Sequence, residues 1–141
     1  MKKIISTLLL TLLFTVSVFA QQDAEGCKDS PVFPKRVPDY SVSECKSNYG
    51  EADFIVAAGG SKTEHKEGTL TMIRYDFYAE TGRQKPSALQ ILKNYENASK
   101  IIGGLTVYQN SNEAIGTYKV MKSGKESAWI KVSPLLVTHN S

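Results

Sequence analysis

The segment from residue 87 to residue 102 constrains the fold of this chain most, because it has the clearest pattern of an amphipathic helix. Ser87 and Gln90 match a capping box, in which each side chain satisfies a backbone donor of the other residue. Gly103-Gly104 ends the helix, since glycine adopts a left-handed cap readily. The helix has a single apolar stripe, which predicts that one of its faces is buried. We expect Leu92 and Tyr95 on this face to pack on a sheet. The stripe consists of Ala88, Ile91, Leu92, Tyr95, Ala98 and Ile102.

The residues before the helix have the composition of short strands. Residues 53–58 form an apolar run closed by two glycines, and residues 69–78 alternate between apolar and polar side chains. The alternation changes phase near Met72, which predicts a bulge or a strand buried on both faces. The polar residues 61–68 are predicted to form a loop between these strands.

Three further strands are predicted after the helix, at residues 105–109, 115–122 and 126–132, with a tight turn at residues 123–125. This order of elements predicts an α+β fold, in which an antiparallel sheet of about five or six strands carries one helix packed on one face.

The first twenty residues have the pattern of a cleavable signal peptide. Lys2 and Lys3 precede an uncharged run that ends at Ala20 in the small-residue pattern that a signal peptidase accepts. The run is shorter than the roughly 20 residues that a membrane span needs. We therefore expect cleavage before Gln21, a single domain over residues 21–141, a periplasmic or secreted location, and no membrane insertion after cleavage.

Cys27 and Cys45 are the two cysteines of the chain. In an exported protein they are expected to form a disulfide that closes the N-terminal segment 27–45. This segment contains three prolines and is predicted to have little regular structure. A metal or redox pair would need more ligands or a Cys-x-x-Cys spacing, and the sequence has neither.

The charges and motifs argue against nucleic acid binding and against catalysis. The chain has 17 basic residues, two of them in the signal peptide, against 14 acidic ones, and the two signs are interspersed. His65 and His139 lack partners at metal-binding spacing. No Gly-x-Ser-x-Gly elbow or phosphate-binding glycine loop is present. The sequence predicts no enzyme activity, no cofactor and no metal site.

The end of the chain predicts an open sheet edge. The strand at residues 126–132 is followed by Pro134, and proline cannot donate to a strand ladder. Unpaired backbone groups on such an edge recruit other strands. We expect the edge to form a homodimer or to accept a strand from a partner. The candidate residues of this interaction edge are Trp129, Lys131, Leu135 and Leu136.

Several stretches of the chain share one resemblance. They are Ile73-Arg74-Tyr75-Asp76, residues 85–104, residues 26–31, Tyr40 and Cys45. Together they resemble the N-terminal periplasmic region of certain OmpA family proteins, over about residues 26–132. The resemblance implies a non-catalytic α+β module. The peptidoglycan-binding domain that follows in that family is absent from this sequence, so the chain is expected to be a truncated relative, and no residue here is assigned to peptidoglycan.

These observations predict a non-enzymatic, exported accessory or interaction module of the cell envelope, with an envelope protein as partner. The alternative is a secreted small-ligand or inhibitor-type binding protein, which would use a concave pocket lined by aromatic residues. Strand propensity favours a packing role for those aromatic residues instead. They are Tyr40, Tyr49, Tyr78, Tyr108, Tyr118 and Trp129.

Overall fold

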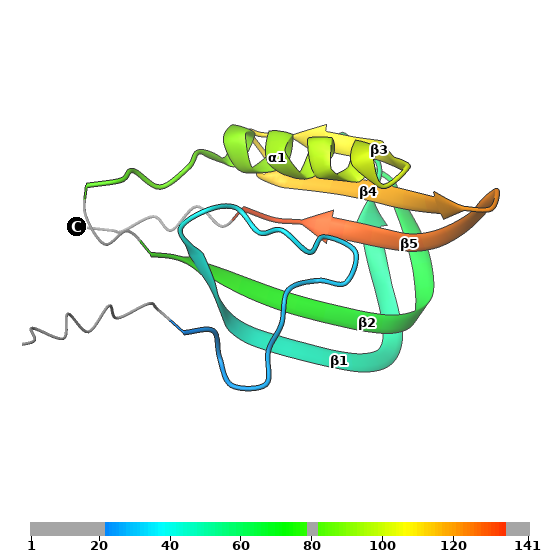
Figure 1. Cartoon of the computed structure of the whole chain (residues 1–141). Coiled ribbons are helices and arrows are strands. Elements are labelled where there is room, and N and C mark those ends of the chain that lie inside the picture. The colour runs from blue at the N-terminus through cyan, green and yellow to red at the C-terminus, as the bar shows by residue number, and fades with distance from the viewer. Residues whose placement is uncertain (1–21, 79–81, 135–141) are drawn as a thin grey trace, which may run out of the picture.

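The computed structural model describes residues 22–78 and 82–134, and Figure 1 shows their arrangement. The predicted signal peptide lies outside the described residues, as do Leu135 and Leu136 of the predicted edge. The elements are β1 (Tyr40–Ile55), the 3-10 turn η1 (Ala58–Gly60), β2 (Thr63–Phe77), α1 (Ala88–Ile101), β3 (Gly104–Asn110), β4 (Ile115–Lys122) and β5 (Lys125–Val132).

The fold is α+β, as the sequence predicts, with antiparallel strands and a helix packed against them. The five strands of the described residues divide into two sheets, the hairpin β1–β2 and the meander β3–β4–β5. In the described residues no strand of the hairpin pairs with a strand of the meander, and the two sheets contact each other through side chains such as Phe54, Trp129 and Thr117. In Figure 1 the hairpin curves across the meander as a separate layer.

The hairpin is longer than the sequence predicts. Most of residues 61–68, predicted as a loop, belong to β2, and β1 begins at Tyr40, within the segment predicted to be irregular. The turn lies at η1, where Gly59 adopts a positive φ of 61°. The start of β2 alternates between exposed and half-buried residues, but its half-buried positions are Glu64, Lys66 and Gly68, so it lacks the apolar alternation by which a half-buried strand is recognised.

The predicted bulge is present in the hairpin but in the other strand. The register shifts in β1, between Val42 and Glu44, and not near Met72 of β2. The phase change near Met72 has a different cause. Before it, Lys66 of β2 packs on Trp129 of the meander, whereas Tyr75 lies on the face that the N-terminal residues cover.

Helix α1 covers one face of the meander, and its predicted start is confirmed. Ser87 and Gln90 form the capping box, with the Gln90 amide donating to Ser87 Oγ at 3.2 Å. Leu92 is fully buried beside Tyr118 of β4. The Tyr118 hydroxyl donates to Gln109 Oε1 at 2.7 Å and lies 3.1 Å from the Leu92 carbonyl oxygen. In the part of the chain that the structure describes, no helix is long and apolar enough to cross a membrane.

The opposite face of the meander holds the far end of the hairpin. Neighbouring residues of a strand point to opposite faces, so Thr117 points away from the helix that Tyr118 contacts. Thr117 Oγ1 donates to the Ile55 carbonyl oxygen at 2.6 Å. The rings of Phe54 and Trp129 pack with their centres 5.5 Å apart. The meander is therefore the middle layer between α1 and the hairpin.

Candidate functional site

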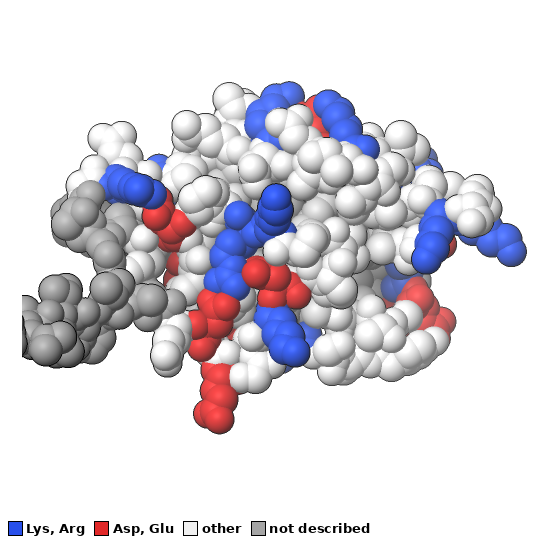
Figure 2. Space-filling view, viewed as in Figure 1, with Lys and Arg blue, Asp and Glu red and all other residues white. Residues whose placement is uncertain are grey.

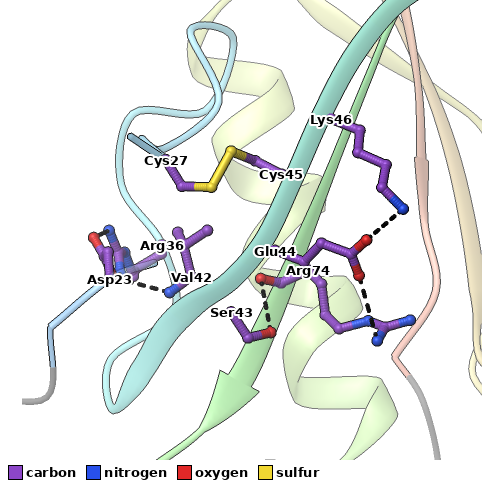
Figure 3. Close-up of a disulfide and its surroundings, with 9 residues drawn as sticks. All are labelled: Asp23, Cys27, Arg36, Val42, Ser43, Glu44, Cys45, Lys46 and Arg74. Carbon is purple, nitrogen blue, oxygen red and sulfur yellow. Dashed lines mark hydrogen bonds and ion pairs between the residues drawn. A yellow bond between two sulfur atoms is a disulfide. The ribbon is translucent and has the colours of Figure 1, made fainter. Parts of the chain in front are cut away.

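The predicted disulfide ties the N-terminal residues to the hairpin. Residues 22–39, called the N-terminal strap below, have almost no regular structure, as expected from their prolines. Cys27 of the strap is bonded to Cys45 of β1, with their Cα atoms 5.7 Å apart. Figure 3 shows this bond on one side of β1, while Glu44 on the other side binds Lys46 and Arg74.

A cluster of charged side chains holds the strap a second time. The Arg36 guanidinium bonds both carboxylate oxygens of Asp29 at 2.9 Å and also pairs with Asp23. Asp23 Oδ1 in turn accepts a hydrogen bond of 2.8 Å from the Val42 amide at the start of β1. Hydrogen bonds from Arg36 and from the Val42 amide lower the pKa of Asp23 to about 2. The Tyr75 hydroxyl of β2 adds a bond of 3.2 Å to Asp29.

Arg36 and Asp23 are 13 residues apart, and Tyr75 and Asp29 are 46 residues apart. No spacing rule connects such positions, so the sequence alone does not predict the cluster. The strap also contributes Phe33, which is 4% exposed and packs edge-on against Tyr95 of α1 at 5.3 Å. Tyr95, predicted to lie on the sheet, thus contacts the strap. Burial raises the pKa of Tyr95 to about 12. The charged and aromatic groups of the strap thus attach it to β1, β2 and α1.

Trp129 of the predicted interaction edge is engaged inside the molecule. Its indole N–H donates to Glu126 at 2.9 Å, and the Lys66 ammonium lies 4.5 Å from the ring centre. Lys66 also pairs with Glu126 at 3.2 Å, and Phe54 packs against the ring. The hydrogen bond from the indole, followed by that from Lys66, lowers the pKa of Glu126. Trp129 therefore holds the hairpin on the meander.

Strand β5 has the open edge that the sequence predicts. Within the described residues it pairs with β4 alone. Lys131 is exposed on this strand, and a register shift lies near Ser127, which is also exposed. Lys131 therefore lies exposed on an open edge, whereas the Trp129 side chain packs against the hairpin.

The aromatic residues that a ligand-binding pocket would use also pack against neighbouring residues or form hydrogen bonds at the surface. Tyr118 is fully buried, and Tyr40 packs on Phe77 with ring centres 5.4 Å apart. Tyr49 is largely exposed and donates to Glu67 at 2.7 Å. Tyr40 and Tyr49 lie on β1, and Tyr118 lies on β4.

Charged groups elsewhere form small mixed clusters. On the face drawn in Figure 2, basic and acidic side chains lie next to one another. His65 lies 2.9 Å from Asp53, and the hydrogen bond to that carboxylate raises the pKa of the imidazole. Among the described residues, no group of three or more His, Cys, Asp or Glu side chains is arranged to hold a metal ion.

No protein-family model, curated protein or solved structure matches this chain.

Proposed function

We propose that this protein is a non-enzymatic, exported accessory module of the cell envelope that binds another protein through the edge of β5. The observation that carries the proposal is that β5 pairs with β4 alone in the described residues. Its other side therefore has backbone N–H and C=O groups that an extended segment of a partner can pair with. Turnover of a generic ester, peptide, glycoside or phosphate substrate by the mature protein would contradict the non-enzymatic part.

The disulfide and the resemblance support the cell-envelope part of the proposal. A structural disulfide such as Cys27–Cys45 is typical of proteins that mature in an oxidising compartment, which agrees with the predicted signal peptide. The resemblance of residues 26–132 to the N-terminal periplasmic region of certain OmpA family proteins points to the same location. We propose a periplasmic or secreted protein with an envelope protein as its partner.

The alternative, a secreted small-ligand or inhibitor-type protein, has less support. It needs aromatic side chains that converge on a pocket. Here Tyr118 lies under α1, Tyr40 lies on Phe77, and Trp129 lies on Phe54. Saturable binding of a small molecule by the purified protein, unaffected by changes on the β5 edge, would favour this alternative.

Export predicts a defined mass for the mature protein. Expressed with its leader in a Gram-negative host, the protein is expected in the osmotic-shock fraction, beginning at Gln21 and two hydrogens lighter than its reduced form. Intact-mass measurement with and without reductant checks both features. Retention of residues 1–20, or free thiols that react in the native protein, would contradict this expectation.

The β5 edge is tested by a charged substitution beside it. Ser127→Lys places a long cation at the exposed bulge of β5, and lysine on an edge strand discourages pairing with another strand. We expect the tagged mature protein to retain an envelope protein from a membrane-fraction extract, and the variant to retain at least about tenfold less, equal to roughly 1.4 kcal/mol of binding energy.

The matched control is Leu105→Lys, which adds the same charge to the other edge of the meander, on β3. This control is expected to retain the partner like the unmodified protein. Equal retention by the Ser127→Lys variant and the unmodified protein would contradict binding at β5, as would loss of the partner in the control alone.

A further inference from the structure

A second open edge of the meander has the features of a self-association site. Strand β3, like β5, pairs with β4 alone in the described part of the chain, so the meander is open on both sides. We propose that two copies of this protein associate through antiparallel pairing of β3 with β3 of the second copy. This inference does not depend on the envelope partner proposed for β5.

The composition of β3 sets it apart from the other strands. Its seven residues, Gly-Leu-Thr-Val-Tyr-Gln-Asn, contain no charged side chain and no proline. Each of the other four strands has at least two charged residues. Charged side chains and proline are the usual means by which proteins protect an edge strand, and β3 has only a register shift between Thr106 and Tyr108. The first part of the strand, Gly104–Thr106, remains regular.

The edge of β5 is less suited to a second copy of the whole molecule. The hairpin packs on the face of the meander next to this edge, through Phe54 on Trp129 and Lys66 on Glu126. The strand itself has three charged side chains, at Lys125, Glu126 and Lys131. An extended segment of a partner needs less room than a folded copy, so the two edges fit different occupants.

Exposed apolar side chains lie at the regular end of β3. Leu105 is 54% exposed, and Ile101, three residues before Gly104, is 84% exposed. A two-fold axis near Leu105 would place Leu105 of the two copies opposite each other, with Gly104 opposite Thr106. Pairing of identical uncharged strands brings no like charges together.

We expect the β3 edge to bind a second copy of the protein because the strand is compatible with an identical strand. An isologous two-fold contact uses the same patch on both subunits, so a patch must be compatible with itself. In β3 the exposed Leu105 meets a second apolar side chain, and the outward-facing backbone groups of the regular part, Gly104–Thr106, meet their counterparts on an identical strand. The expected assembly is a dimer with a continuous six-stranded antiparallel sheet.

Sedimentation velocity of the mature protein over a wide concentration range tests the proposal. We expect a concentration-dependent monomer–dimer equilibrium. Leu105→Lys places two like charges opposite each other and is expected to raise the dissociation constant at least about tenfold. The matched control, Ser127→Lys on β5, is expected to leave the dissociation constant unchanged. Both positions are exposed, and unchanged circular dichroism spectra verify that the variants fold.

A crosslinking measurement locates the contact without relying on loss of affinity. Leu105→Cys is expected to give a covalent dimer on mild oxidation, while Ser127→Cys stays monomeric, and peptide mapping verifies that Cys27–Cys45 is intact in both. A protein that remains monomeric at every concentration and gives no Leu105→Cys dimer would overturn the proposal. Dissociation by Ser127→Lys alone would also overturn it. A protein that is monomeric at every concentration would leave envelope binding at β5 untouched.

Discussion

Leu92→Ala is expected to lower the free energy of unfolding by about 2–5 kcal/mol, as truncation of a fully buried leucine does. Leu92 packs where α1 lies against Gly116 and Tyr118 of β4. A Cβ atom at Gly116 would lie 2.9 Å from Leu92 Cδ2 and 2.6 Å from the Tyr118 hydroxyl oxygen. Tyr118 is held by its bond to Gln109, so the surrounding groups cannot easily move to fill the cavity. The cost is therefore expected toward the upper part of the range.

Denaturant unfolding followed by fluorescence measures this loss, since Trp129 is the one tryptophan of the chain. Leu89→Ala is the matched control, because Leu89 lies on the same helix with 51% of its surface exposed. The control is expected to change the free energy of unfolding by no more than about 0.5 kcal/mol. Equal losses in the two variants would show that the buried face of α1 has been assigned wrongly.

Removal of the disulfide by Cys27→Ala and Cys45→Ala is expected to lower the free energy of unfolding by about 3 kcal/mol. The bond closes a loop with a sequence separation of 18 residues, and in the chain-entropy model a crosslink over such a loop contributes about this amount. The strap has little secondary structure of its own, so few backbone hydrogen bonds replace the crosslink. Unfolding in urea at neutral pH checks the value.

Reductant provides the control for the double variant. It is expected to destabilise the unmodified protein to a similar extent and to leave the variant unchanged. A loss below about 1 kcal/mol without the disulfide would contradict the crosslinking role of the bond.

The Arg36 cluster still holds the strap in the variant. The pKa of Asp23 is lowered from 3.8 to about 2 by folding, so the stabilisation that Asp23 contributes is complete above pH 3.8 and is lost as the pH falls through about 2.

Local patterns were sufficient for the helix and the three strands after it. The capping box at Ser87 and the glycines after the helix depend on backbone groups a few residues away, and the structure confirms both ends within one or two residues. The turn between β4 and β5 is equally local, with positive φ angles at Ser123 and Gly124. The disulfide also followed from the sequence, because only two cysteines were present.

The hairpin is where local pattern was least informative. Apolar alternation marks a half-buried strand, but Glu64, Lys66 and Gly68 occupy the half-buried face at the start of β2, so residues 61–68 were assigned to a loop. Hydrophobicity also did not predict the burial of Ser99, which is polar. A Cβ atom at Gly104 would lie 2.2 Å from Ser99 Oγ, so α1 and β3 approach closely at this point because residue 104 is a glycine.

The candidate sites depended on tertiary structure throughout. Arg36 meets Asp23, and Lys66 meets Trp129, across 13 and 63 residues of chain, distances that no short-range rule connects. The sequence indicated an edge at β5, but only the order of the strands in the meander showed that β3 is the opposite edge. Helix and turn formation depends on neighbouring residues, whereas ion clusters, packed rings and open edges depend on which distant segments the fold brings together.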